Sequence, residues 1–412
     1  MKKRIWVAAA AALALAACQD QYGRSSKHLS PIPPATMSLM ASKGMSKSDP
    51  IVIRAYKKES ELEVWKRGGD GRFALLKTYP ICRWSGQLGP KIREGDRQAP
   101  EGFYTITPAH MNPNSSFYLS FDTGYPNAFD RAHGRTGSHL MVHGSCSSRG
   151  CYAMTDEIIA EVFAIARESF AGGQRNFQFQ AYPFRMTAEN LARHRADPHI
   201  DFWRNLKEGS DYFEVMREEP KVAVCNRRYV FGGADAASCA PQIPDAVARK
   251  RQADEQKVAD LVARGTPAIK LVYDDGGGHQ SFRQALVRTA GADEVNFPIL
   301  DARPRNLGEV SRPEALANGP REVVLDGGKP KPSTALAYAA AERAGARPAS
   351  APAPAAAQAA AVPAAEKSLY DRVLGTLFGS TAEAEAAPQP ATAPVPPRRN
   401  PDRRAQAPVT LR

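Results

Sequence analysis

The chain has 412 residues, a formal net charge of +12 and 43% hydrophobic residues. This length can hold one or two folded domains, but the Ala/Pro-rich C-terminal part lacks the apolar density of a core. The positive charge alone would suit a nucleic-acid-binding protein, yet the export signal described next argues against that partner and leaves attraction to an acidic polymer outside the cytoplasm.

The N-terminus has the pattern of a secretory signal. Basic residues at positions 2–4 precede an apolar run over 5–14, too short to span a membrane, and a Leu-Ala-Ala-Cys sequence ending at Cys18 closes it. This ending predicts that Cys18 becomes a lipidated N-terminus after export; cleavage by an ordinary signal peptidase, with Cys18 uninvolved, is the alternative. We expect a signal peptide over 1–17, a tether over 18–48, and a periplasmic protein anchored to a membrane by its lipid.

A β-rich unit follows the tether. Runs of apolar and β-branched residues predict strands, several of them bounded by Gly, Pro or Asp turns. The expected strands cover residues 51–56, 62–66, 75–81, 103–106, 117–121, 139–143 and 177–182. Together they predict a mainly β domain over 49–185.

The segment 139–154 carries the strongest chemical signal. A strand-like run delivers His143, Gly144 ends it, and a Ser/Gly-rich stretch leads to Cys151. A thiol is mostly protonated near neutral pH, so a nucleophilic cysteine needs a nearby base, and the intervening stretch is long enough for thiol and imidazole to meet. Gly150 permits a turn that aims the N–H groups of Gly150 and Cys151 at one point, as a tetrahedral oxyanion requires. The residues predict cysteine acyl transfer with His143 as the base.

A helix is expected directly after this segment. Thr155 is a good N-cap, and Asp156 and Glu157 place acids in the first turn. An amphipathic pattern then continues until Gly172 and Gly173. The nucleophile would lie in a turn just ahead of a helix, a placement that modestly favours the thiolate.

Two blocks carry a resemblance to a known family. His143-Gly144 followed by Ser148-Arg149-Gly150-Cys151 resembles the signature of the L,D-transpeptidase (YkuD-like) catalytic domain, which is HG, a variable gap, then S-x-G-C. Residues 86–106 resemble the family's Pro-x-Gly-x-[FY] turn and following strand. The Cys-Tyr-Ala-Met-Thr run from Cys151 and residues 182–187 are similar to the YafK-like murein enzyme branch. The resemblance covers roughly residues 49–232.

The resemblance implies a fold and an activity. The fold is an L,D-transpeptidase-type β-sandwich catalytic domain with added helices (α+β). The implied activity is acyl transfer on diaminopimelate-containing peptidoglycan stem peptides through a Cys151 thioester, without a cofactor. Family members cross-link stem peptides, attach lipoproteins or release them. The resemblance therefore implies a wall-anchored lipoprotein as a further partner. The implied catalytic residues are Cys151, His143, Gly150 and Gly144. The resembling block implies that Lys91, Arg97 and Tyr104 bind substrate, and Arg149 in the turn is a further candidate. Ser148 is a candidate to bind substrate near the thiol, with capping of the turn as the alternative. His139 is expected on the same strand face as His143, where it would orient His143 or contact substrate, with a structural role as the alternative.

One position departs from the family pattern. Many members have an arginine two residues after the nucleophile, where this chain has Ala153, and Arg149 in the turn is a candidate substitute. Transfer and hydrolysis both stay open, with hydrolysis or release favoured. A non-catalytic peptidoglycan-binding lipoprotein of the same fold is the alternative function.

The remaining cysteines suggest disulfides. In an oxidising compartment Cys225 and Cys239 are reasonable partners, and Cys82 and Cys146 are a further possible pair. A zinc site is a weaker hypothesis, because the available ligands lack a familiar spacing and the family pattern explains them better. Its ligands would be His139, His143, Cys146 and Cys151. No metal is expected.

The rest of the chain divides into three regions. Helices over 187–194 and 202–207 and strands over 221–225 and 228–231 predict an α/β extension at 186–245, which packs on the sheet. An accessory region at 246–330 contains a predicted helix, 246–263, a strand, 268–273, and a Gly-Gly-Gly run at 276–278. That run lacks the Lys and Ser/Thr of a phosphate-binding loop and predicts a turn. Residues 331–412 form an Ala/Pro-rich basic tail that is expected to be disordered, with 368–379 a candidate docking helix.

Overall fold

A computed structural model of the chain describes residues 26–233, 239–282, 319–326 and 329–330. These residues all belong to one compact unit. The expected signal peptide, Cys18 and the Ala/Pro-rich tail, including 368–379, lie outside the described residues. None of the helices in the described ranges has the length and apolarity that a membrane span needs.

The first sheet has five strands in the order β3-β2-β1-β10-β5. Its strands are β1 (Ile51–Tyr56), β2 (Glu61–Arg67), β3 (Phe73–Pro80), β5 (Gly102–Ile106) and β10 (Phe177–Tyr182). β1 pairs with β10 in parallel, and the other neighbours are antiparallel. β1 is buried at every position because it lies at the centre of the sheet with both faces covered.

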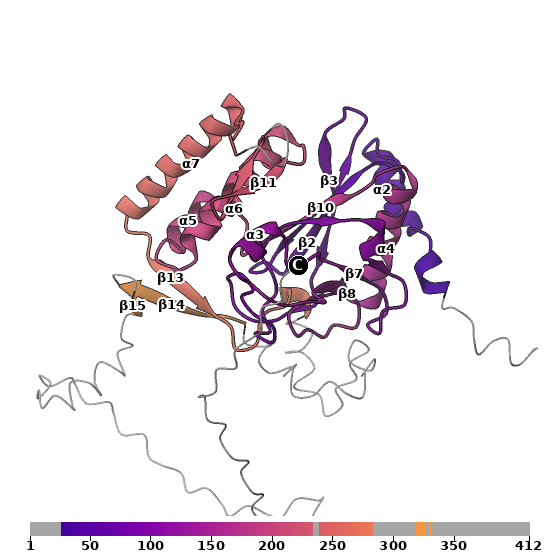
Figure 1. Ribbon diagram of the computed structural model, residues 1–412, viewed down its shortest axis with the longest axis horizontal. Coiled ribbons are helices and arrows are strands. Elements are labelled where there is room, and N and C mark those ends of the chain that lie inside the picture. The colour runs from indigo at the N-terminus through magenta and orange to yellow at the C-terminus, as the bar shows by residue number, and fades with distance from the viewer. Residues whose placement is uncertain (1–25, 234–238, 283–318, 327–328, 331–412) are drawn as a thin grey trace, which may run out of the picture. The chain divides into compact units, whose positions relative to one another are not determined.

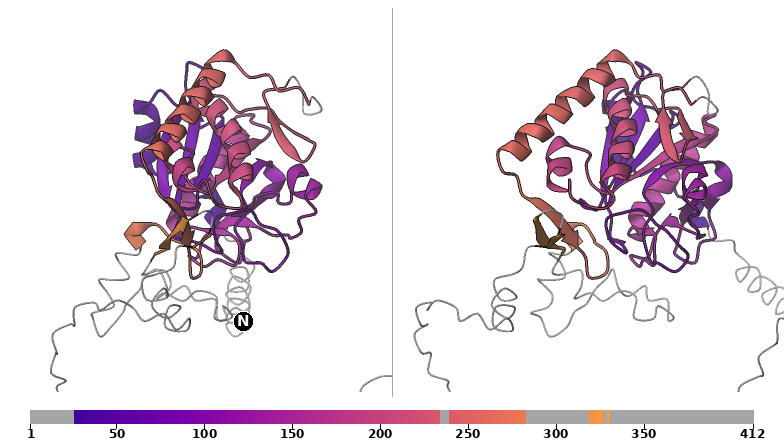
Figure 2. Two further views of the ribbon diagram at one scale, coloured as in Figure 1. Left: turned by 90° about the vertical axis from the view of Figure 1, so that its left-hand side faces the viewer. Right: turned by 60° about the vertical axis from the view of Figure 1, so that its left-hand side comes forward.

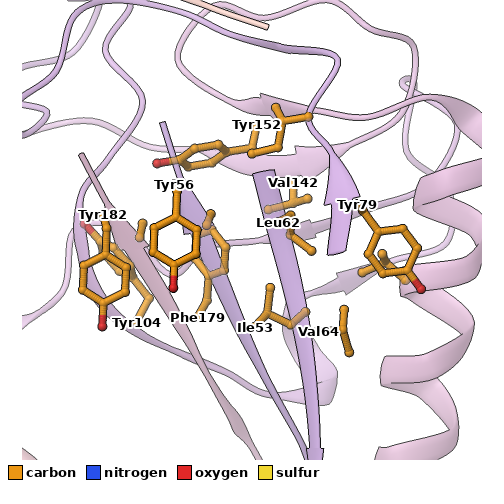
Figure 3. Packing of buried hydrophobic residues seen from close by; sticks show 14 of the residues in the cluster. Ile53, Tyr56, Leu62, Val64, Tyr79, Tyr104, Val142, Tyr152, Phe179 and Tyr182 are labelled. Atoms are coloured by element: carbon orange, nitrogen blue, oxygen red, sulfur yellow. The ribbon is translucent and has the colours of Figure 1, made fainter. Parts of the chain in front are cut away.

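The second sheet is built from short strands in the order β4-β9-β8-β7-β6. These are β4 (Arg83–Trp84), β6 (Met111–Asn112), β7 (Ser120–Asp122), β8 (Met141–His143) and β9 (Tyr152–Ala153). Its aromatic side chains pack on the first sheet: the rings of Tyr152 and Phe121 lie 5.7 Å and 6.0 Å from that of Phe179. Figure 3 shows Val142 and Tyr152 at this interface. The expected β-sandwich with added helices is confirmed.

Helix α4 (Asp156–Ala171) covers one edge of the sandwich and follows β9 after a two-residue link. Thr155 caps it by accepting a hydrogen bond from the N–H of Ile158, as the sequence predicts. Short helical segments η3 (Pro108–His110) and α3 (Ala128–Ala132) lie in the connections between strands. Because β9, the Thr155 cap and α4 follow one another directly, they fix the position at which the turn before β9, which contains Cys151, ends.

The segment before β1 differs from the expected tether. It contains η2 (Ser26–Leu29) and α2 (Pro34–Ser42), which lies beside α4 (Figure 1). Thr36 Oγ1 donates to Glu161 Oε1 at 2.5 Å, and Arg167 Nη1 donates to the carbonyl oxygen of Ser30 at 3.1 Å. Met40 is buried in the main core, only 1% exposed. Residues 26–48 are part of the folded body because their scattered apolar side chains find places in the core.

The α/β extension and the accessory region follow the sandwich. Their elements are α5 (Ala188–Arg193), α6 (Ile200–Met216), β11 (Val222–Cys225), β12 (Arg228–Phe231), α7 (Asp245–Ala263), β13 (Ala268–Val272), β14 (Arg321–Asp326) and β15 (Lys329–Pro330). α7 contacts both α5 and α6, and Figure 2 shows it from two sides. After β13 the chain returns to the second sheet, where Gly277 and Trp84 exchange backbone hydrogen bonds at 3.0 Å and 2.8 Å. The glycine run thus extends this sheet beyond β4 instead of forming a simple turn.

Candidate active site

The second sheet delivers the candidate nucleophile and base on one face. β8 and β9 are parallel, with Val142 opposite Tyr152 and His143 opposite Ala153. Val142 and Tyr152 point into the core between the sheets and are fully buried. Successive side chains of a strand alternate between its faces, so His143 lies on the face away from that core. Cys151 immediately precedes β9, two residue pairs along from His143 and therefore on the same face.

The Cys151 thiol lies against the backbone at the start of β8. Its Sγ accepts a hydrogen bond from the N–H of Met141 at 3.4 Å and lies 3.8 Å from the carbonyl oxygen of His139. Cys151 is partly exposed and is the free cysteine of the described residues. The thiol is therefore both accessible and held within two residues of His143 along the neighbouring strand.

The His143 imidazole is buried and has one defined partner. Its Nδ1 lies 2.6 Å from the carbonyl oxygen of Gly144, and its ring packs 4.7 Å from that of Phe117. An N–H at Nδ1 donates to this carbonyl, which leaves Nε2 as the unprotonated nitrogen of a neutral ring. Burial lowers the pKa of His143 to about 4. At neutral pH the ring is thus a free base.

The electrostatics of Cys151 differ from the sequence prediction. Burial raises the pKa of the thiol to about 11; the N–H of Met141 and the charge of Lys91 lower it, and the charge of Asp122 raises it further. The turn before α4 was expected to favour the thiolate, but desolvation outweighs that effect. The resting site holds a neutral thiol and a neutral imidazole.

The predicted oxyanion donors do converge on one point, which a side chain occupies. The N–H groups of Gly150 and Cys151 donate to Ser148 Oγ at 3.3 Å and 3.1 Å. Ser148 Oγ in turn donates to the carbonyl oxygen of Cys151 at 2.8 Å and lies 2.9 Å from Ser85 Oγ. Gly150 has a φ of 124°, a conformation that favours glycine. Ser148 therefore closes the turn and engages both donors in this conformation.

Comparison with known proteins identifies the fold. The model of the YkuD L,D-transpeptidase catalytic domain matches residues 50–171. Proteins named "Putative L,D-transpeptidase YafK" from Escherichia coli K12 and O157:H7 are each 46% identical over 181 residues, covering 44% of this chain and 73% of the relative. The chain belongs to the L,D-transpeptidase family. 

Solved structures give weaker likenesses. The helical cell shape determining protein Pgp2 of Campylobacter jejuni is 16% identical, with a TM-score of 0.28, covering 57% of this chain and 80% of its own. Bd1075 of Bdellovibrio bacteriovorus is 22% identical, with a TM-score of 0.24, covering 33% and 49%. At these scores neither supports a conclusion about function.

Three residues expected to contact substrate take other places in this L,D-transpeptidase domain. Lys91 is 2% exposed, and its Nζ lies 2.5 Å from Asp96 Oδ1, so a buried ion pair and not a groove holds it. Tyr104 is a core residue (Figure 3) whose hydroxyl donates to the carbonyl oxygen of Glu101 at 3.1 Å. His139 is exposed with a φ of 54°, outside β8, so it does not share a strand face with His143. Its carbonyl oxygen lies 3.8 Å from the Cys151 thiol.

The two remaining candidates, Arg149 and Gly144, differ in exposure. Arg149 is exposed in the turn before Cys151. Gly144 donates its N–H to the carbonyl oxygen of Phe117 at 3.0 Å, and a Cβ there would collide with the Asp156 carboxylate. A side chain at position 144 would therefore disturb the packing of this strand end against Asp156, whereas the Arg149 side chain is exposed at the surface.

The sequence reasoning missed Arg83. Arg83 pairs with Ala153 across β4 and β9, so an arginine adjoins the position where many family members carry one. Its Nη2 donates to Asp275 Oδ2 at 2.6 Å and to the Asp275 carbonyl oxygen at 2.8 Å. Asp275 Oδ1 also accepts from Arg97 Nη2 at 2.7 Å, so Arg97 is held in an ion pair. A two-residue strand has no periodic pattern, and the Asp275 contact is 192 residues away, so no local signal marks Arg83.

Two disulfides secure the regions around the site. Cys82 is bonded to Cys146 and Cys225 to Cys239, the two pairs that the sequence suggested. The first bond ties the start of β4 to the loop between His143 and Cys151, where Ser145 and Cys146 have φ values of 65° and 43°. Left-handed backbone at two successive non-glycine residues is costly and needs such restraints.

The site shows no metal-binding arrangement. Within the described residues, no three His, Cys, Asp or Glu side chains are placed to hold a metal ion. Cys146, one of the four ligands of the zinc hypothesis, is consumed by its disulfide. Cys151 contributes a free thiol to this site and His143 an imidazole.

Proposed function

We propose that the protein is an exported cysteine acyl-transfer enzyme that acts on peptidoglycan stem peptides through a Cys151 thioester. The observation that carries this proposal is the pairing of β8 with β9, which brings an accessible free thiol beside a neutral histidine. The family membership supports the substrate class. A basic chain of net charge +12 is also attracted to a polymer with free carboxylates.

The proposed chemistry moves one proton and exchanges one amide bond for a thioester. As Cys151 Sγ attacks the amide carbonyl, its proton passes to Nε2 of His143, and the imidazolium then protonates the departing amine. Because the thiol has a pKa of about 11 and the imidazole about 4, proton transfer accompanies attack and does not precede it. The thioester is released by water or by a second amine.

The oxyanion of the tetrahedral intermediate needs donors. In the proposed mechanism a rotation of the Ser148 side chain releases the N–H groups of Gly150 and Cys151, which converge on the space that Ser148 Oγ leaves. Donors fixed in the backbone are preorganised for this task. Ser148 is thus proposed to control the oxyanion site, and Arg149 to contact substrate from the turn.

The direction and place of the reaction follow from the sequence features. We propose release or hydrolysis over cross-linking, because Ala153 replaces the family arginine and the YafK relatives share the run after the nucleophile. A wall-anchored lipoprotein is a proposed partner. Cys18 is proposed to carry a lipid that holds the enzyme at a membrane in the periplasm.

A second function also has an observation in its favour. The protonated thiol and the engaged oxyanion donors suit a non-catalytic peptidoglycan-binding lipoprotein of the same fold. In that case Cys151 would be inert toward a carbapenem or a soft alkylating agent. Reaction of Cys151 with either reagent favours the enzyme.

The first prediction concerns Cys151 itself. The chain from residue 19 onward and its Cys151→Ala variant are incubated with isolated peptidoglycan sacculi, and the products are identified by mass spectrometry. We expect Cys151-dependent release of peptides or attached protein, because the thioester needs the thiol. New diaminopimelate-linked dimers lost in the variant would instead establish a transpeptidase. Identical products from both proteins would favour the binding role.

A further inference from the structure

A carboxylate lies on the candidate active face beside the thiol. Asp122, at the end of β7, is paired with Met141 of β8, and Met141 donates its N–H to Cys151 Sγ at 3.4 Å. Ser120 Oγ lies 3.3 Å from Met141 Sδ, so side chains of β7 and β8 meet on this face. Directly paired residues of adjacent strands project to the same side of a sheet. Asp122, Met141 and Cys151 therefore form one row across β7, β8 and the residue before β9.

The Asp122 carboxylate has capacity for a ligand. It is partly exposed, and its Oδ1 accepts the N–H of Gly124 at 2.7 Å. Among the residues that the structure describes, no cation forms an ion pair with it, whereas Lys91, the cation that also acts on the thiol, is already paired with Asp96. The charge of Asp122 raises the pKa of Cys151. Asp122 is thus a partly exposed carboxylate near the thiol that no described cation neutralises by an ion pair.

We propose that Asp122 binds the primary ammonium group of the amine that leaves or enters at the Cys151 thioester. The inference rests on the proposed function and deepens it by assigning the amine side of the reaction to β7. A row of paired residues places this carboxylate two strands from the thiol, within the length of a short aminoalkyl chain. Ammonium and carboxylate groups attract each other most strongly where water is partly excluded.

The assignment is consistent with the chemistry in both directions. In cleavage, the amine leaves His143 with one proton, takes a second from water, and is held as an ammonium by Asp122 before it diffuses away. In the reverse direction an ammonium collects at Asp122, loses one proton to solvent and a second to His143 as its nitrogen attacks the thioester, and the thiol is regenerated. Asp122 is thus a positioning residue for the amine. An amine held at Asp122 competes with water for the acyl group of the thioester.

A purely structural role for Asp122 predicts a different outcome. The Gly124 contact is a turn that an Asn side chain makes equally well through its own Oδ1. Asp122→Asn therefore keeps the turn and removes only the charge. Asp70 offers a matched control: its Oδ1 accepts the N–H of Arg72 at 3.0 Å in the exposed β2–β3 hairpin of the other sheet.

The test uses two thiol reagents that differ in charge. Full-length protein is treated with methanethiosulfonate ethylammonium or methanethiosulfonate ethylsulfonate, and modification of the Cys151 peptide is followed by mass spectrometry. In each reaction the thiolate displaces methanesulfinate and a mixed disulfide forms. The cationic-to-anionic rate ratio cancels any change in thiolate fraction, since both reagents need the same thiolate.

The expected result is a ratio that depends on Asp122. Relative to wild type, Asp122→Asn lowers the ratio by roughly fivefold or more, while Asp70→Asn leaves it unchanged, since a single charge acts mainly over short distances. Equal ratios in wild type and Asp122→Asn would overturn the inference, as would a Cys151 that the ammonium reagent cannot modify. Activity on sacculi separates the two proposals. If this activity depends on Cys151 while wild type and Asp122→Asn have the same cationic-to-anionic rate ratio, the proposed function stands and the amine site fails.

Discussion

At the scale of single residues, the thiol and imidazole are set by burial. The Cys151 thiol has a pKa raised to about 11 and the His143 imidazole one lowered to about 4, so both are neutral across the physiological range. A cysteine paired as thiolate with imidazolium would show the opposite shifts. The resting site therefore holds an uncharged thiol and an uncharged imidazole.

This arrangement predicts the pH dependence of alkylation. The rate of reaction of Cys151 with iodoacetamide follows the thiolate fraction, so we expect it to keep rising with pH through 9 and to be more than tenfold slower at pH 8 than that of a free cysteine. The measurement is a pH series on intact protein, with a cysteine-containing peptide as the reference. A rate that reaches a plateau near pH 7 would show an ion pair instead.

At the scale of elements, the accessory region completes the second sheet. Asp274–Gly278 runs beside β4, where Gly276 lies against the Trp84 backbone too closely for any side chain, and its φ of 77° also favours glycine. Asp275 is thereby placed between Arg83 and Arg97. Arg83 is fully buried, and its Nε and Nη1 have no hydrogen-bond partner among the described residues. The Asp275 carboxylate is the charge that offsets this guanidinium.

Loss of that carboxylate should destabilise the fold. Asp275→Asn leaves the buried Arg83 charge without its partner, and we expect the free energy of unfolding to fall by about 3 kcal/mol. Urea unfolding followed by tryptophan fluorescence measures the change. The control, Glu189→Gln, breaks an ion pair with Lys257 whose side chains are 50% and 54% exposed, and should cost less than about 1 kcal/mol. A similar small loss in both variants would argue against this role of Asp275.

The sequence was most informative where a pattern is local. The strand over 177–182 was predicted with its observed bounds, because apolar and polar residues alternate from Phe177 to Ala181 and Gly172-Gly173 lie shortly before it. The strand expected at 139–143 begins only at Met141, since His139 takes a left-handed conformation that alternation does not reveal. The segment that pairs with β4 was predicted as a turn, because its partner strand is far away in sequence. Cys151 and His143 were named from the sequence alone, whereas Arg83 and Asp122 became visible only through strand register.

At the scale of the whole molecule, the N-terminal segment belongs to the catalytic body. Met40 of α2 is 1% exposed, and Met37 on the same helix is 36% exposed. Met40→Ala should lower the free energy of unfolding by about 2 to 3 kcal/mol through the lost burial and the cavity, and Met37→Ala should change it little. Urea midpoints of the two variants provide the measurement. If this segment were a flexible tether, Met40→Ala and Met37→Ala would change the free energy of unfolding by similarly small amounts.

The ordered N-terminal segment would also shorten the reach of a lipid anchor at Cys18, the one proposed above. With a tether ending at Ser48, thirty residues beyond a lipidated Cys18 would have a contour length of roughly 100 Å. Ser26 in η2 already belongs to the folded body and lies eight residues after Cys18, so the chain between them can span at most roughly 28 Å. A lipid on Cys18, as proposed above, would hold the folded body within about this distance of its membrane, so the anchor as well as the active site would restrict which layers of peptidoglycan are reached.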